Sequence, residues 1–100
     1  MRTMIAVMAA ALLLSATAAH AGVYRREVRQ NIRIDRGICR GSLTRAEARA
    51  LRGEQRNIVR IYDRAAADGM ITRQEANQLA RAQNRADLHI YRLNHNAHVQ

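Results

Sequence analysis

The side chains with the clearest chemical potential in this sequence are arginines that recur on one side of a predicted helix. Successive members are four, three, four and four residues apart, and at 100° per residue this spacing keeps them on one helical face. The members of this predicted arginine face are Arg45, Arg49, Arg52, Arg56 and Arg60. Such a row favours binding of an anionic envelope component or an acidic protein, and the alternative is a solvated face in an arginine-rich chain.

Two carboxylates in a predicted loop could contribute to a calcium site. Residues 68–75 resemble the second half of an EF-hand loop, with Asp68 and Glu75 at its fifth and twelfth positions. The first and third positions of that loop fall on Arg64 and Ala66, so two oxygen ligands are missing. We therefore interpret Asp68 as a turn residue and Glu75 as a helix-capping residue, with calcium binding as the alternative.

Three histidines near the carboxyl terminus form the other candidate metal site. They are His89, His95 and His98. Their imidazole nitrogens suit Zn²⁺ or Cu²⁺. The sequence after Leu93 lacks the helical periodicity that would hold them in one geometry, so ordinary surface histidines are the simpler interpretation. We expect no metal and no other cofactor.

The composition argues against catalysis. All 17 basic residues counted as Lys or Arg are arginines, which excludes lysine chemistry such as a Schiff base. Cys39 is the only cysteine and has no histidine near it in sequence. The three tyrosines are the only aromatic residues, which argues against a base-stacking surface for nucleic acid. We expect a non-enzymatic protein in which Cys39 is either a free thiol or the link of a disulfide-linked dimer.

Residues 1–21 have the composition of a signal peptide. Arg2 precedes an apolar stretch, and Ala19-His20-Ala21 has the small-x-small form of a cleavage site. The apolar stretch is shorter than the ~20 residues of a membrane-spanning helix. We expect cleavage between Ala21 and Gly22, a periplasmic or secreted protein with no transmembrane anchor, and one mature domain over 22–100.

Two segments of the mature chain resemble each other at an offset of 28 residues. Segments 35–48 and 63–76 align, and with the residues that follow them they share nine identities at this offset. Each contains a Gly, an apolar residue and Thr-x-x-Glu, which predicts a turn followed by a capped helix. We therefore expect capping boxes that begin at Thr44 and Thr72.

The apolar spacing predicts the helices that these turns connect. One helix is expected over about 45–66, another follows Thr72, and 24–36 is expected to be helical although its apolar residues spread around the circumference. Gln55 and Gln83 lie at equivalent points beside the two apolar stripes, where boundary hydrogen bonding accounts for them.

The predicted fold class is all-α. We expect a small three-helix up-down-up bundle built from two 28-residue helix-loop-helix repeats. Its loops are expected near 35–44 and 63–72, and the tail 94–100 is expected to be flexible.

The motifs of the mature chain resemble those of a known group of proteins. These motifs are Gln30, Gly37-Ile38, Gly41-Ser42-Leu43-Thr44, Gln83-Asn84-Arg85, Ile90-Tyr91-Arg92 and His95-Asn96. The chain resembles small exported proteobacterial proteins of the Gly-x-Leu-Thr-x-x-Glu-Ala type, over almost all of 22–100. It departs from them at Ile32, which replaces a usually polar residue. The resemblance implies an exported helical protein with two repeats, and the group has no assigned activity.

These observations predict a small exported basic protein that serves as a non-enzymatic binding or structural module of the cell envelope. Its arginine face would dock anionic partners, and strong salt dependence would distinguish this function. The alternative is a metal-responsive protein that binds Ca²⁺ through the degenerate EF-hand-like loop, or Zn²⁺ or Cu²⁺ through the terminal histidines.

Overall fold

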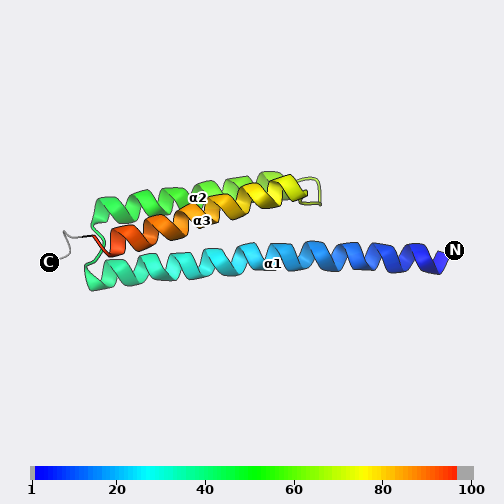
Figure 1. Ribbon diagram of the computed structural model, residues 1–100, viewed down its shortest axis with the longest axis horizontal. Coiled ribbons are helices and arrows are strands. Elements are labelled where there is room, and N and C mark those ends of the chain that lie inside the picture. Colours follow the sequence, from blue (N-terminus) through cyan, green and yellow to red (C-terminus); the bar gives the residue numbers. More distant parts are fainter. Residues whose placement is uncertain (1, 97–100) are drawn as a thin grey trace.

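The protein forms a bundle of three helices. The computed structural model describes residues 2–96, with side chains from residue 21 onward. The helices are α1 (Arg2–Arg40), α2 (Arg45–Ala66) and α3 (Arg73–Asn94), and each contacts the other two. α2 runs back along α1 and α3 returns again, so the two connections lie at opposite ends (Figure 1). The predicted all-α, up-down-up bundle is therefore confirmed for the described residues.

Both predicted capping boxes form. The Thr44 hydroxyl accepts a hydrogen bond from the Glu47 amide at 3.1 Å, and the Glu47 carboxylate accepts one from the Thr44 amide at 2.9 Å. Thr72 and Glu75 repeat this exchange at the same two distances. Since a helix leaves its first amide groups without intrahelical acceptors, these side chains fix where α2 and α3 begin.

α1 continues past the predicted loop boundary and ends at Arg40, so the connection is shorter than the 35–44 expected from the sequence. Gly37 lies inside the helix, where a single glycine costs only about 1 kcal/mol. The helix ends just before Gly41, whose φ of 75° is one that glycine adopts without a steric penalty. Its amide donates to the Ile38 carbonyl and the Ser42 amide donates to the Gly37 carbonyl, which is the Schellman pattern of a helix end.

The second connection uses a similar glycine with a different local hydrogen bond. Gly69 has a φ of 84°, and its amide donates to the Ala66 carbonyl at 3.0 Å. The Asp68 carboxylate accepts from the Met70 amide at 3.3 Å, which is the two-residue pattern of an Asx turn. Asp68 and Glu75 thus serve the turn and the cap, as predicted.

The apolar core consists of two clusters. Near the α1–α2 connection the buried members are Ile34, Leu43, Leu51 and Ile90. Toward the α2–α3 connection they are Ile58, Ala65, Leu79, Ala82 and Ala86. Each fully buried Leu or Ile contributes about 1.5–3 kcal/mol relative to exposure. Gln55 lies between Leu51 of the first cluster and Ile58 of the second, so the clusters are separated along α2 by a polar residue.

The buried face of α1 differs from its apolar pattern. Val28 and Ile32 are exposed, whereas Gln30, Ile34 and Gly37 are buried at steps of four and three residues. A polar residue and a glycine therefore occupy two of the three core positions. Because two core positions of α1 are not apolar and two of its apolar residues are exposed, its apolar residues form no single stripe in the sequence.

Gly37 is buried at a point where the neighbouring residues leave no room for a side chain. A Cβ atom at this position would lie 2.6 Å and 2.7 Å from Leu43 side-chain atoms and would also meet the Asn94 carboxamide oxygen. That oxygen accepts a hydrogen bond of 2.5 Å from the Ser42 hydroxyl. The absence of a side chain at Gly37 thus lets the first turn and the end of α3 close on α1.

We predict opposite effects of two Gly→Ala substitutions inside helices. Gly37→Ala should lower the free energy of unfolding by about 1–3 kcal/mol, because it overpacks this junction. Gly53→Ala should raise it by about 0.5–1 kcal/mol, since its Cβ would have open space and only the Arg56 side chain nearby at 3.7 Å. Urea unfolding of both variants measures the difference, and equal effects would contradict close packing at Gly37.

Candidate functional site

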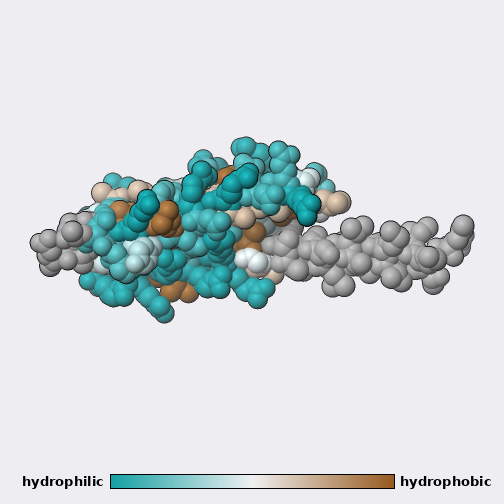
Figure 2. All heavy atoms as spheres, viewed as in Figure 1, coloured by the Kyte–Doolittle hydropathy of each residue, from teal (hydrophilic) through white to brown (hydrophobic). Residues whose placement is uncertain are grey.

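Four arginines of the predicted arginine face are exposed on α2. They are Arg45, Arg49, Arg56 and Arg60, and none of them takes part in the ion pairs formed among residues 21–96. The described surface is predominantly hydrophilic on the face drawn in Figure 2, with small separate apolar areas. These four guanidinium groups are therefore available to a partner.

Arg52 has a different place from the one its spacing predicts. One of its nitrogens donates to the Asn31 carboxamide at 2.9 Å, and the other pairs with the Asp35 carboxylate. Both partners belong to α1. The structure therefore assigns Arg52 to the α1–α2 interface rather than to the exposed row.

The acidic side chains are largely used within the fold. Asp87 accepts from Arg26 at 2.6 Å and from Arg33 at 2.9 Å, which ties α3 to α1. The Glu54 carboxylate lies 2.5 Å from the His89 imidazole, between α2 and α3. Asp35 is held by Arg52, and three further acids are engaged in the caps and turn described above. Asp35 and Asp87 are thus neutralised by arginines of the fold, and four further acids are held by hydrogen bonds within it.

Most arginines show the opposite behaviour. Only Arg26, Arg33 and Arg52 form ion pairs with carboxylates among residues 21–96. The exposed arginines outside these pairs and outside the arginine face include Arg29, Arg36, Arg40, Arg64, Arg73, Arg81, Arg85 and Arg92. Most arginines of residues 21–96 therefore lie at the surface without an acidic partner, which makes the surface of this chain of charge +9 strongly basic.

A layer of three glutamines lies between the two apolar clusters. Gln30, Gln55 and Gln83 come from the three different helices, and each is at most 4% exposed. The Gln55 amide donates to the Gln30 oxygen at 2.9 Å, and the Gln30 amide donates to the Gln83 main-chain carbonyl at 2.9 Å. Because buried polar groups are costly unless they are hydrogen-bonded, this layer is stable only when the three helices share one alignment.

Ion pairs extend the glutamine layer to the surface on both sides. On one side, the Gln30 amide also donates to Asp87 at 2.9 Å, and Asp87 holds Arg26 and Arg33. On the other side, the Asn31 amide approaches the Gln55 oxygen at 3.5 Å, and the Asn31 oxygen accepts from Arg52. A continuous polar chain therefore crosses the bundle.

The sequence contained a signal for this layer, but its interpretation was wrong in one respect. Gln55 and Gln83 occupy equivalent points in the aligned segments, which marks them as related. They are core residues and not boundary residues, and their third partner, Gln30, precedes the alignment. Periodicity alone does not reveal that three polar residues from three helices satisfy one another.

The Asp87 carboxyl has a lowered pKa. Burial raises its pKa, but hydrogen bonds from Arg26 and Gln30 and the charges of Arg26 and Arg33 outweigh that effect. The ionised form is therefore favoured in the folded protein relative to the unfolded chain.

The predicted metal ligands have separate partners. His89 pairs with Glu54, while the His95 nitrogen lies 2.7 Å from the Tyr91 carbonyl oxygen and its ring stacks on Tyr91. His98 lies outside the described residues. Within the described part of the chain, no group of three or more His, Cys, Asp or Glu side chains is placed to hold a metal ion.

Cys39 lies near the end of α1 and is exposed as a free thiol. Its position leaves the thiol accessible, and the disulfide-linked dimer stays a prediction. The side chains of the predicted signal peptide lie outside the described residues except for Ala21, so its cleavage also stays a prediction.

Comparisons with known proteins do not place the chain in a family. No protein-family description, curated protein or solved structure matches the chain. Among the helices of the described residues, none has an apolar stretch of the length needed to cross a bilayer.

We predict that Gln30 is more important for stability than its polar character suggests. Gln30→Leu should lower the free energy of unfolding by about 1–3 kcal/mol, because it leaves the buried Gln55 amide without its acceptor. Gln78→Leu, at an exposed position of α3, should change it by less than about 0.5 kcal/mol. Urea denaturation followed by circular dichroism measures both, and equal effects would show that the layer adds no stability.

We predict that stability declines with acid in a way that depends on Asp87. Its folded pKa is lowered, so its contribution is present above the ordinary value of about 3.9 and is lost as pH falls through the lowered value. The free energy of unfolding should therefore fall below about pH 4, and Asp87→Asn should make this fall less steep. Urea unfolding at a series of pH values tests it, and parallel pH profiles would refute the assignment.

Proposed function

We propose that the protein is an exported, non-enzymatic module of the cell envelope that docks an anionic surface through the exposed arginines of α2. The observation that carries this proposal is the division of charge. Asp35, Asp87 and Glu54 are paired within the bundle, whereas Arg45 and Arg60 are exposed at the two ends of the row. A partner with negative charge would meet guanidinium groups that form no ion pair with the acids of residues 21–96.

The shape of the arginine row favours an extended partner over a small anion. Arg45 and Arg60 are 15 residues apart on a continuous helix, which separates them by about 22 Å. A guanidinium group binds phosphate oxygens through two parallel hydrogen bonds, so a row of them suits a surface with many phosphates. An anionic lipid surface has this character.

Export would bring the row to such a surface. The signal-peptide features of residues 1–21 support delivery to the periplasm or beyond, where anionic envelope components are present. Exposed arginines near an anionic membrane contribute about 1 kcal/mol each, so several acting together give a measurable, salt-sensitive affinity.

Binding to lipid vesicles tests this proposal. The purified protein should sediment with vesicles of phosphatidylglycerol and phosphatidylcholine at low salt, and should be released at about 0.5 M salt, where charges are screened within a few ångströms. Substitution of Arg45, Arg49, Arg56 and Arg60 by Gln should weaken binding at least about tenfold.

The matched control removes the same charge from another helix. The control variant replaces Arg73, Arg81, Arg85 and Arg92 of α3 by Gln, and it should retain most of the binding. Equal loss in both variants would show that net charge and not the α2 row is responsible. Equal binding to pure phosphatidylcholine vesicles would overturn the proposal.

A further inference from the structure

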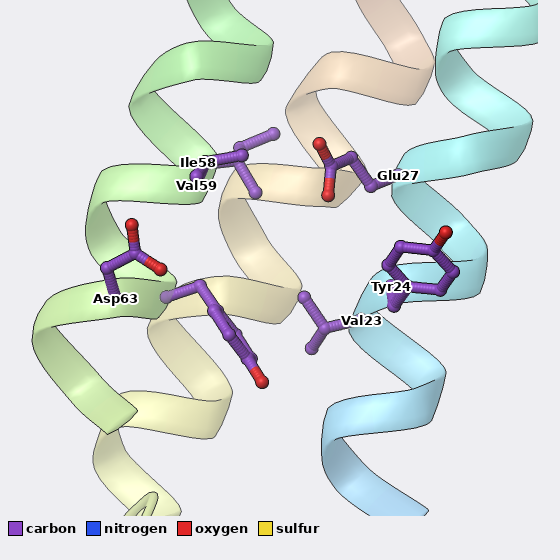
Figure 3. Close-up of a pocket in the computed structure, with 7 residues that line it drawn as sticks. Val23, Tyr24, Glu27, Ile58, Val59 and Asp63 are labelled. Carbon is purple, nitrogen blue, oxygen red and sulfur yellow. The ribbon is translucent and has the colours of Figure 1, made fainter. Parts of the chain in front are cut away.

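A groove lies between α1 and α2, beside the apolar cluster nearer the α2–α3 connection. Its volume is about 260 Å³. The residues that line it are Val23, Tyr24, Glu27, Ile58, Val59, Tyr62 and Asp63. Figure 3 shows that α1 and α2 supply opposite walls of this hollow.

The inner part of the groove is apolar. Ile58 is 3% exposed and belongs to the core cluster, and Val23 packs against that cluster. Tyr24 is 66% exposed, which places an aromatic ring at the solvent side of the hollow. The volume is slightly below the range of typical ligand pockets, so the occupant would be small.

Two carboxylates line this apolar hollow. Glu27 extends from α1 toward the space between the helices, and the Asp63 carboxylate lies over the ribbon of α2 on the other side of the hollow (Figure 3). Among residues 21–96, the side chains of Glu27 and Asp63 form no ion pair and accept no hydrogen bond. Every other acidic side chain of these residues does one or the other. Arg60 and Arg64 are nearby in sequence but do not line the groove. The hollow is thus a locally acidic place on a basic protein.

We infer that this groove binds a small organic amine that carries an apolar or aromatic body. The body would lie against Val23, Ile58 and Val59, and the ammonium group would lie at the end of the hollow lined by the Glu27 carboxylate, with the negative charge of Asp63 on the opposite wall. An ammonium in this position also gains from nearby aromatic rings, since cations are attracted to ring faces. An anion would be repelled by the carboxylates, so this site selects the charge opposite to that selected by the arginine face.

Titration with a matched pair of small probes tests the inference. Phenethylamine and phenethyl alcohol share an aromatic body and differ in charge at the polar end. Methyl signals of Val23, Ile58 and Val59 should shift in a saturable manner with the amine in NMR spectra of the full protein. The alcohol should bind about tenfold more weakly, because it lacks the charge-assisted hydrogen bonds.

Two double variants separate the site from general electrostatics. Glu27→Gln with Asp63→Asn should weaken amine binding about tenfold and leave alcohol binding unchanged. Glu54→Gln with Asp68→Asn changes net charge equally at positions outside the groove, and it should leave amine binding unchanged.

Three outcomes would overturn the inference. Equal affinity for amine and alcohol would identify an apolar hollow without charge recognition. An absence of saturable shifts would show that the hollow holds no amine. Concentration-dependent shifts of the same signals in the protein alone would assign the groove to contact with a second copy of the chain. None of these outcomes bears on vesicle binding, which depends on different residues.

Discussion

The arrangement of the bundle depends on the requirement that Gln30 be fully hydrogen-bonded. This side chain is 1% exposed, and it accepts from Gln55 of α2 while donating to the Gln83 carbonyl and to Asp87 of α3. Apolar clusters tolerate small rotations and shifts of helices, because hydrophobic contact is not directional. A buried amide does not, since a shift of one helix would leave a donor or acceptor unpaired. The glutamine layer therefore specifies one alignment, as a polar residue does at the core of a coiled coil.

That alignment also decides which charges reach the surface. With the helices in this register, Arg52 lies opposite Asn31 and Asp35 of α1 and is used in the interface. Arg49 and Arg56 occupy neighbouring turns of the same helical face but lack such partners among the described residues, and they remain exposed. On the other side of the bundle, Asp87 gathers two arginines of α1. The fold thus leaves most arginines of residues 21–96 exposed without acidic partners, and the proposed docking surface is a consequence of that arrangement.

Local features of this structure were predictable from the sequence, whereas features that depend on contacts between helices were not. The capping boxes at Thr44 and Thr72 and the positive φ angles of Gly41 and Gly69 follow from a few adjacent residues. The start of α2 and the start of α3 were correct for that reason. The extension of α1 through Gly37 depends on the close approach of Leu43, which lies in the following connection, and of Asn94, which lies at the end of α3. Likewise, the spacing of Arg52 gives no sign that Asp35 pairs with it.

The glutamine layer also connects the core to the groove between α1 and α2. The Gln83 amide donates to the Val23 carbonyl at 3.1 Å, which holds the first wall residue of the groove from the side of α3. The Asn31 amide donates to the Glu27 carbonyl at 3.0 Å and also approaches Gln55, so the backbone that carries the groove's α1 carboxylate is tied to the same layer. Groups held by hydrogen bonds before a ligand arrives lose less entropy when it binds. The interaction that gives the bundle its register therefore also preorganises the wall on which an amine would be recognised.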